Sequence, residues 1–159
     1  YTTEQTAAAV KVFKELKTPF ILNQARYNLL DRTVKETGLL DLARKEGFGV
    51  IAYSPLAQGL LTERYAGGIP EDSRTKKSGS LKEETLTPEL FQKLAALRAV
   101  AERRGQTLPA LALSWVLRDG VVPSVIIGAS SSKQILENIN VNPSFTSEEL
   151  AEIEQICKA

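Results

Sequence analysis

The 159-residue sequence contains no histidine, no methionine and only one cysteine, Cys157. Without histidine the chain has no histidine-based metal site, no Ser–His–Asp triad and no Cys–His pair. A single cysteine cannot form an intrachain disulfide and is typical of a reducing compartment, so we expect a cytoplasmic protein with a surface thiol. Because a gene product begins with methionine, we also expect the chain to be a fragment or a processed product.

Neither charge sign is in excess, and long apolar runs are absent. Lys and Arg number 20 and Asp and Glu 19, a net charge of +1. This balance argues against binding a nucleic acid or a membrane surface through bulk charge. No apolar run approaches the roughly 18–20 residues that span a bilayer. The polar first residues, Tyr1 to Gln5, do not resemble a secretory signal.

Helical patterns alternate with short apolar runs along the chain. The runs predict strands at 20–24, 49–53 and 124–128, and their continuous apolar character predicts a sheet buried on both faces. The stretch 54–87 is rich in Gly, Ser, Pro and charge, and a loop of this length is usually functional or disordered. Helices are predicted at 7–16, 38–46, 88–104, 108–118, 131–139 and 147–158, with Thr3 and Ser147 as N-caps of the first and last.

Alternating helices and strands are typical of a parallel sheet. Three strands cannot close a barrel, because a (β/α)8 barrel needs about 250 residues. The sequence therefore predicts an α/β fold in which residues 1–159 are the C-terminal part of a (β/α)8 TIM barrel, namely its last three βα units plus a C-terminal helix. The alternative is a small open α/β sheet.

Polar residues gather at the carboxyl ends of the three predicted strands, where parallel α/β folds bind ligands. They are Asn23-Gln24, the run from Tyr53 to Gly59, and the run from Gly128 to Ser131. The third group combines a glycine with a helix N-terminus, whose free N–H groups attract phosphate. Each group also has an ordinary interpretation, as a loop amide, a core aromatic or a helix cap.

A polar ridge is predicted on the helix that follows the third group. Gln134, Glu137 and Asn138 have spacings of three and four residues and therefore share one helix face. Such a ridge, directed back at the helix start, is suited to a base or a ribose. Its other interpretation is a solvated helix face.

Three segments resemble a known family. They are Asn23-Gln24-Ala25-Arg26-Tyr27-Asn28-Leu29-Leu30, Tyr53-Ser54-Pro55-Leu56-Ala57-Gln58-Gly59-Leu60-Leu61-Thr62, and Ile127-Gly128-Ala129-Ser130 with Glu137-Asn138. In order and spacing, the whole chain resembles the aldo-keto reductase superfamily, above all bacterial glyceraldehyde-3-phosphate/methylglyoxal-type reductases and potassium-channel β-subunits. The resemblance implies an NADP(H)-binding portion of an enzyme that reduces a small aldehyde or ketone by hydride transfer.

The resemblance also implies a role for each matching residue. Gln24 matches the glutamine that hydrogen-bonds the nicotinamide carboxamide, and Tyr53 matches the aromatic residue that stacks on the nicotinamide ring. The pyrophosphate-lining segment and the basic residues of the covering loop are matched by Ser54, Pro55, Leu56, Ala57, Gln58, Arg64 and Arg74. The adenosine and 2′-phosphate site is matched by Gly128, Ser130, Gln134, Glu137 and Asn138. The other interpretation of the two arginines is solvated loop charge.

The family's catalytic Tyr, Lys, Asp and His lie on the first four strands, and this chain matches the family only from just after the fifth. None of Tyr1, Tyr27, Tyr53 and Tyr65 matches the catalytic tyrosine. We therefore expect no catalytic residue and no metal site, and an association with the missing N-terminal half or with a second copy. Two alternatives stay open. One is a non-catalytic interaction module, channel-β-subunit-like or a self-associating half-barrel, and the other is an unrelated α/β nucleotide-binding domain.

Overall fold

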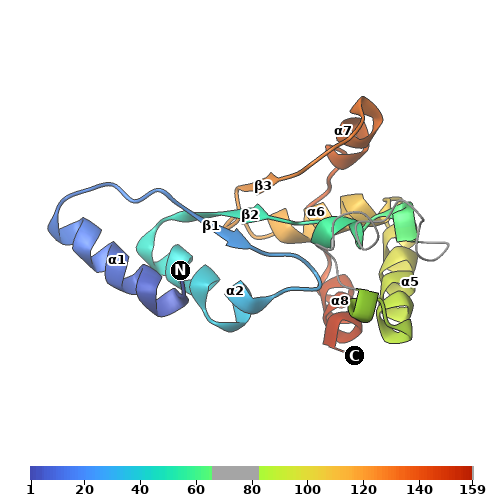
Figure 1. Ribbon diagram of the computed structural model, residues 1–159, viewed down its shortest axis with the longest axis horizontal. Coiled ribbons are helices and arrows are strands. Elements are labelled where there is room, and N and C mark those ends of the chain that lie inside the picture. Colours follow the sequence, from blue (N-terminus) through green and yellow to red (C-terminus); the bar gives the residue numbers. More distant parts are fainter. Residues whose placement is uncertain (66–82, 159) are drawn as a thin grey trace.

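The computed structural model describes residues 1–65 and 83–158 and contains one parallel sheet (Figure 1). Its strands are β1 (Leu22–Arg26), β2 (Gly49–Tyr53) and β3 (Ser124–Ile126), in that spatial order. The register pairs Arg26 with Tyr53 and Tyr53 with Ile126, so the carboxyl ends of the strands lie side by side. The predicted parallel sheet is confirmed.

Every predicted helix is present, with ends that differ by a few residues. The four-residue helix α2 (Thr33–Glu36) is not predicted by the sequence pattern, because it is too short to show a period. Three short 3-10 turns, η1 (Ala57–Gly59), η2 (Glu63–Tyr65) and η3 (Glu83–Thr85), follow β2. The helices are α1 (Thr3–Glu15), α2 (Thr33–Glu36), α3 (Leu39–Glu46), α5 (Pro88–Arg103), α6 (Leu108–Leu117), α7 (Ser132–Asn138) and α8 (Ser147–Lys158).

Two boundaries near the N-terminus differ from the sequence prediction. The cap of α1 is Thr2 and not Thr3: the Thr2 hydroxyl accepts from the Gln5 N–H at 3.2 Å, and Gln5 Oε1 accepts from the Thr2 N–H at 2.9 Å. This reciprocal pair is a capping box, which fixes the cap three residues before Gln5. The first strand covers residues 22–26 and not 20–24, so Gln24 lies in its middle.

One face of the sheet is covered and the other is open. Ala25, Val50 and Ala52 are buried on the covered face, beneath the helices. On the opposite face Leu22 is 44%, Tyr53 40% and Ile126 47% exposed. The prediction of two buried faces is therefore wrong for the described residues. An apolar run indicates that both faces suit apolar contact, but no described segment supplies that contact on the second face.

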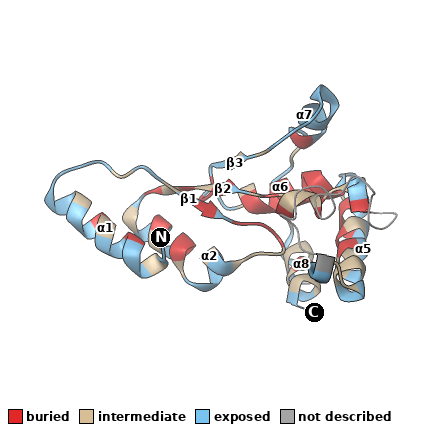
Figure 2. Ribbon diagram, in the orientation of Figure 1, coloured by how far each residue is buried: buried red, intermediate tan, exposed pale blue. Residues whose placement is uncertain are grey.

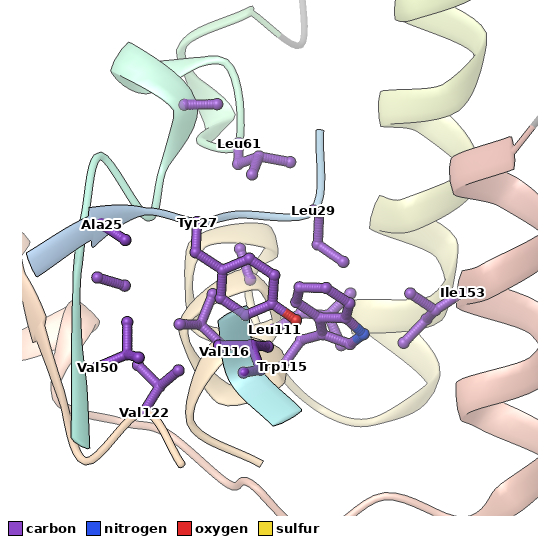
Figure 3. Close-up of a cluster of buried hydrophobic side chains, with 14 of the residues drawn as sticks. Ala25, Tyr27, Leu29, Val50, Leu61, Leu111, Trp115, Val116, Val122 and Ile153 are labelled. Carbon is purple, nitrogen blue, oxygen red and sulfur yellow. The ribbon is translucent and has the colours of Figure 1, made fainter. Parts of the chain in front are cut away.

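The core lies between the covered sheet face and α6 (Figure 3). All residues of α6 from Leu108 to Val116 are buried, as in a helix that is apolar on every side. The Trp115 indole of α6 lies against the Tyr27 ring, with centroids 5.2 Å apart. On the far side of the indole, Figure 3 shows Ile153 of α8. The core thus joins the sheet, α6 and the C-terminal helix.

Helix α8 begins with a capping box that belongs to Thr146 and not to the predicted Ser147. The Thr146 hydroxyl accepts from the Glu149 N–H at 3.2 Å, and the Thr146 N–H donates to the Glu149 carboxylate at 2.8 Å. The same carboxylate forms an ion pair with Arg104, at the end of α5. Glu149 therefore caps α8 and joins it to α5.

Further along α8, Glu154 joins the helix to the segment after β1. Both of its carboxylate oxygens accept from Arg32 Nη2 at 2.5 Å, and Lys35 and Lys158 each lie 3.3 Å away. The hydrogen bonds from Arg32, with smaller contributions from Lys158 and Lys35, lower the pKa of Glu154 to about 2. The ionised carboxylate therefore stabilises the folded chain.

We expect Glu154→Gln to lower the free energy of unfolding by on the order of 1 kcal/mol at pH 7. A lowered pKa gives stability that is complete above the ordinary value of 4.5 and is lost as the pH falls towards 2, so the difference from wild type should shrink over that range. Urea unfolding at several pH values measures it. The control is Glu152→Gln, which removes a more exposed pair with Arg103. If the two variants lost equal free energy of unfolding at pH 7, the prediction would be contradicted.

Within residues 1–65 and 83–158, no helix is long and apolar enough to cross a membrane. The same residues hold no group of three or more His, Cys, Asp or Glu side chains placed to bind a metal ion. Cys157 is partly buried and not a surface thiol, and burial raises the pKa of the thiol above its usual value. The sulfur is therefore predominantly protonated at neutral pH.

Candidate functional site

Gln24 and Tyr53 lie on the open face of the sheet. Gln24 pairs with Ile51 and Arg26 with Tyr53, so Gln24 and Tyr53 are diagonal neighbours on one face. Both side chains are exposed. Arg26, beside Tyr53, forms an ion pair with Asp31 at 3.1 Å. The structure therefore brings the predicted amide and the predicted aromatic ring to the same accessible surface.

The chain turns sharply after β2, through residues with a left-handed backbone. The φ angle is +52° at Ser54, +47° at Ala57 and +58° at Gln58. Residues with a side chain disfavour this region by roughly 1–2 kcal/mol each. The Ser54 carbonyl accepts from the Ala57 N–H at 3.0 Å, which closes the turn. Backbone strain of this kind clusters at functional sites.

A polar atom inside this turn lacks a partner among the residues that the structure describes. Gln58 Oε1 is buried, and no described residue donates a hydrogen bond to it. A buried acceptor without a donor is unfavourable by about 1–3 kcal/mol. In the same turn Pro55 and Ala57 are buried, whereas Ser54 and Leu56 are partly exposed. An unsatisfied polar side chain and a strained backbone at the end of a parallel strand fit a site for a polar ligand.

Asn28 is absent from the set of site residues that the sequence predicts, yet it holds this turn. The side chain is wholly buried, and its Nδ2 donates to the Ser54 carbonyl at 2.9 Å. Its Oδ1 accepts from the N–H groups of Leu30 and Asp31, at 2.9 and 2.8 Å. An asparagine between the apolar residues Tyr27 and Leu29 is the signal that identifies it, because buried amides are retained only where they are hydrogen-bonded.

The third predicted group lies at the start of α7, which is seen at the top of Figure 1 and contacts α6. β3 ends at Ile126 and not at 128, so Gly128 follows the strand, with open space where a Cβ would lie. The Ser130 N–H and hydroxyl donate to Gln134 Oε1 at 2.8 and 3.1 Å. Ser131 is the N-cap, since its hydroxyl accepts from the Gln134 N–H. Ser130 and Gln134 are thus in direct contact.

The predicted polar ridge on α7 is only partly present. Gln134 turns back towards the helix start, whereas Glu137 lies 3.8 Å from Lys133. Both side chains are exposed, but Asn138 is buried (Figure 2). The interpretation of the whole ridge as a solvated helix face is therefore wrong at Asn138, because the last turn of α7 faces the protein.

Of the two arginines predicted to bind the cofactor from the loop 54–87, only Arg64 lies within the described residues. Arg64 is exposed in η2, where its backbone N–H donates to the Thr62 hydroxyl at 3.2 Å. Arg74 lies outside the described residues, as does the whole of 66–82. The structure therefore describes Gln24, Tyr53 and the first part of the predicted loop, while residues 66–82 lie outside the described residues.

The sequence model of the Aldo/keto reductase family matches residues 1–158. The chain belongs to this family. It is 44% identical, over 98% of its length, to the L-glyceraldehyde 3-phosphate reductases of Escherichia coli O157:H7 and Escherichia coli K12. The chain spans 46% of those relatives. The alternative of an α/β nucleotide-binding domain unrelated to this family is therefore wrong.

A solved structure gives the same result for the fold. The glycerol dehydrogenase of Gluconobacter oxydans matches with a TM-score of 0.75 and 27% identity, over 98% of this chain and 46% of that protein. The predicted α/β fold with a parallel sheet, similar to part of an aldo/keto reductase barrel, is confirmed. The open face of the sheet corresponds to the side that faces the inside of such a barrel.

Proposed function

We propose that this chain is the NADP(H)-binding portion of an aldo/keto reductase that reduces small aldehydes or ketones. The observation that carries the proposal is the placing of Gln24 and Tyr53 on one accessible face, beside the strained turn of residues 54–58. The names of the similar proteins, a glyceraldehyde phosphate reductase and a glycerol dehydrogenase, favour a carbonyl–alcohol pair as substrate and product. The single, partly buried cysteine favours a cytoplasmic location.

Gln24 and Tyr53 would hold the nicotinamide end of the cofactor, which supplies the hydride when bound. The Gln24 amide has both a donor and an acceptor, so it matches a carboxamide and fixes the rotation of the ring. The Tyr53 phenol ring offers a flat apolar face for stacking. Two contacts on one rigid sheet restrict the ring to one orientation, and orientation of this kind contributes strongly to rate.

The turn after β2 would line the pyrophosphate. Pro55, Leu56 and Ala57 give it a compact apolar wall, and Ser54 adds a hydroxyl donor. Gln58 can offer its amide N–H groups to phosphate oxygens, because the two amide ends are exchangeable by rotation. Arg64 and Arg74 add positive charge for the pyrophosphate and the 2′-phosphate.

The start of α7 would hold the adenosine end. Gly128 lets the ligand approach the backbone, and Ser130 and Gln134 offer polar groups at the helix start. Glu137 and Asn138 complete the set on the following turn. The 2′-phosphate is the group that distinguishes NADP(H) from NAD(H), so the two arginines and Ser130 decide this preference.

The proton for the reduced carbonyl would come from a residue that this sequence does not contain. Tyr27 is poorly suited, because burial raises the pKa of its hydroxyl and Arg118 already donates to that oxygen. Tyr65 is buried as well. The chain's part in the reaction is then to bind and orient the cofactor, without acid–base chemistry.

We expect the purified 159-residue chain to reduce no aldehyde. With NADPH and methylglyoxal, the absorbance of NADPH should stay at its starting value, because the proton donor is missing. The full-length Escherichia coli L-glyceraldehyde 3-phosphate reductase is the positive control. Measurable NADPH-dependent turnover by the 159-residue chain would overturn this assignment of roles.

An interaction module is the second candidate. It is favoured by the apolar side chains on the open face, with Leu22 and Ile126 nearly half exposed. In this alternative the face pairs with a second copy or with the N-terminal half of the barrel. Native mass measurement of the same purified chain discriminates, since a clean monomer argues against association between copies.

A further inference from the structure

The buried amide of Asn28 uses each of its hydrogen-bonding ends to fasten a different piece of backbone. Its Nδ2 donates to the Ser54 carbonyl, while its Oδ1 accepts from the N–H groups of Leu30 and Asp31. The Asn28 N–H also donates to the Asp31 carbonyl at 3.0 Å. The segment after β1 is therefore a closed turn. The Asn28 side chain links this turn to the segment after β2 through one hydrogen bond, the bond to Ser54.

Ser54 has a backbone conformation that needs such a link. Its φ of +52° lies in the left-handed region, which a residue with a side chain leaves unless its surroundings hold it there. Its carbonyl accepts two hydrogen bonds, from Asn28 Nδ2 at 2.9 Å and from the Ala57 N–H at 3.0 Å. The bond from Ala57 is part of the turn itself, so Asn28 provides the support from outside it.

The same support reaches the neighbouring residue, Tyr53. The Tyr53 carbonyl accepts from the Tyr27 N–H at 3.5 Å, one residue before Asn28. Consecutive residues after β1 thus hold the consecutive carbonyls of Tyr53 and Ser54. These two carbonyls set the direction in which the Tyr53 ring leaves the sheet and the path on which the turn begins.

We infer that Asn28 is a positioning residue, which holds Tyr53 and the turn of residues 54–58 in the shape that binds the cofactor. The inference rests on the proposed function, because it concerns the same site. Asn28 touches no substrate or cofactor in this role. It acts through the Ser54 backbone, by stabilising a left-handed conformation that the turn would otherwise leave.

The test is NADPH affinity, measured by fluorescence titration on the natural gene product that contains this sequence. Asn28→Ala removes all three side-chain hydrogen bonds. At neutral pH Asn28→Asp keeps the acceptor for Leu30 and Asp31 but puts a carboxylate oxygen, which repels the Ser54 carbonyl, in place of the donor. It therefore tests the link to Ser54 a second time if Asn28→Ala does not fold. Each is expected to weaken NADPH binding by about tenfold, the size expected for loss of one such hydrogen bond.

Ser114→Ala is the matched control. Ser114 is equally buried, on α6, and makes three hydrogen bonds: from Gln106 Nε2 at 3.0 Å, from the Asn142 N–H at 2.9 Å, and to the Ala110 carbonyl at 2.6 Å. The Asn28 and Ser114 variants should both melt at lower temperature, but Ser114→Ala should bind NADPH like wild type. An equal loss of affinity in both would overturn the inference, because the role of Asn28 would then be general stability.

A rescue experiment separates positioning from stability. Glycine adopts a positive φ without penalty, so in Ser54→Gly the turn should depend less on the hydrogen bond from Asn28. Asn28→Ala should therefore weaken binding by about threefold or less when added to Ser54→Gly, against about tenfold alone. A full tenfold loss in both backgrounds would overturn the inference. If wild type itself does not bind NADPH, the proposed function fails; if wild type and Asn28→Ala bind alike, only the role of Asn28 fails.

Discussion

Trp115→Ala is expected to lower the free energy of unfolding by about 4 kcal/mol, the largest stability loss that we predict for a single substitution in this chain. Trp115 is almost fully buried in α6 and lies against the Tyr27 ring. The Arg118 guanidinium lies over the indole at 3.9 Å, and that of Arg32 at 5.8 Å. Truncation therefore leaves a cavity and also removes the aromatic face that two partly buried cations use.

The comparison for this substitution is Trp115→Phe, which keeps a ring in the same place. It should lose about half as much stability, because part of the cavity is filled and a weaker cation–π surface remains. Urea unfolding followed by far-UV circular dichroism is the right measurement, since Trp115 is the only tryptophan and its fluorescence disappears with it. A loss below about 2 kcal/mol for Trp115→Ala would show that the surrounding core collapses to fill the space.

Tyr53→Ala is expected to lower kcat/KM for the NADPH-dependent reaction of the natural gene product by about 10- to 100-fold. Loss of the stacking face accounts for about tenfold, and looser orientation of the nicotinamide accounts for the rest. The ring is 40% exposed on the open sheet face, so stability should change little in comparison. Steady-state kinetics with a small aldehyde, together with NADPH titration, measure both effects.

Two controls make the Tyr53 result specific. Tyr53→Phe keeps the ring and removes the hydroxyl, and it should retain most of the activity. Leu22→Ala removes a side chain of similar exposure at the opposite end of the same face, and it should leave NADPH affinity unchanged. If Leu22→Ala weakened NADPH binding as much as Tyr53→Ala, the effect would come from the sheet face in general and not from stacking.

Most of the fold could be predicted because its signals are local. The strands are short apolar runs. Pro88 indicates the start of α5 and Gly47 the end of α3, and both helices agree with the prediction within one residue. The errors arise where a local signal has two solutions. Thr2 and Thr3 are both good caps, and only the position of Gln5 selects Thr2.

The sequence predicts less of the site, because several of its features exist only in the folded chain. The identity of Gln24 and Tyr53 can be read from single strands, but the role of Asn28 depends on a contact with Ser54, 26 positions away. The strain at Ser54, and the buried Gln58 Oε1 to which no described residue donates, are likewise properties of the folded chain. The burial of Asn138 follows from how α7 packs, which helical spacing alone does not contain.

The burial of α6 on every side determines how the molecule unfolds. This helix contacts β3 and also α5 and α7, and all its residues from Leu108 to Val116 are shielded from water. If either the sheet or the helices beside it detached, α6 would expose a large apolar surface to water. Neither the sheet nor the helices around α6 can therefore unfold alone without a large cost in free energy. The sheet and the helices around α6 form one cooperative unit, whose amide protons should exchange together through global unfolding.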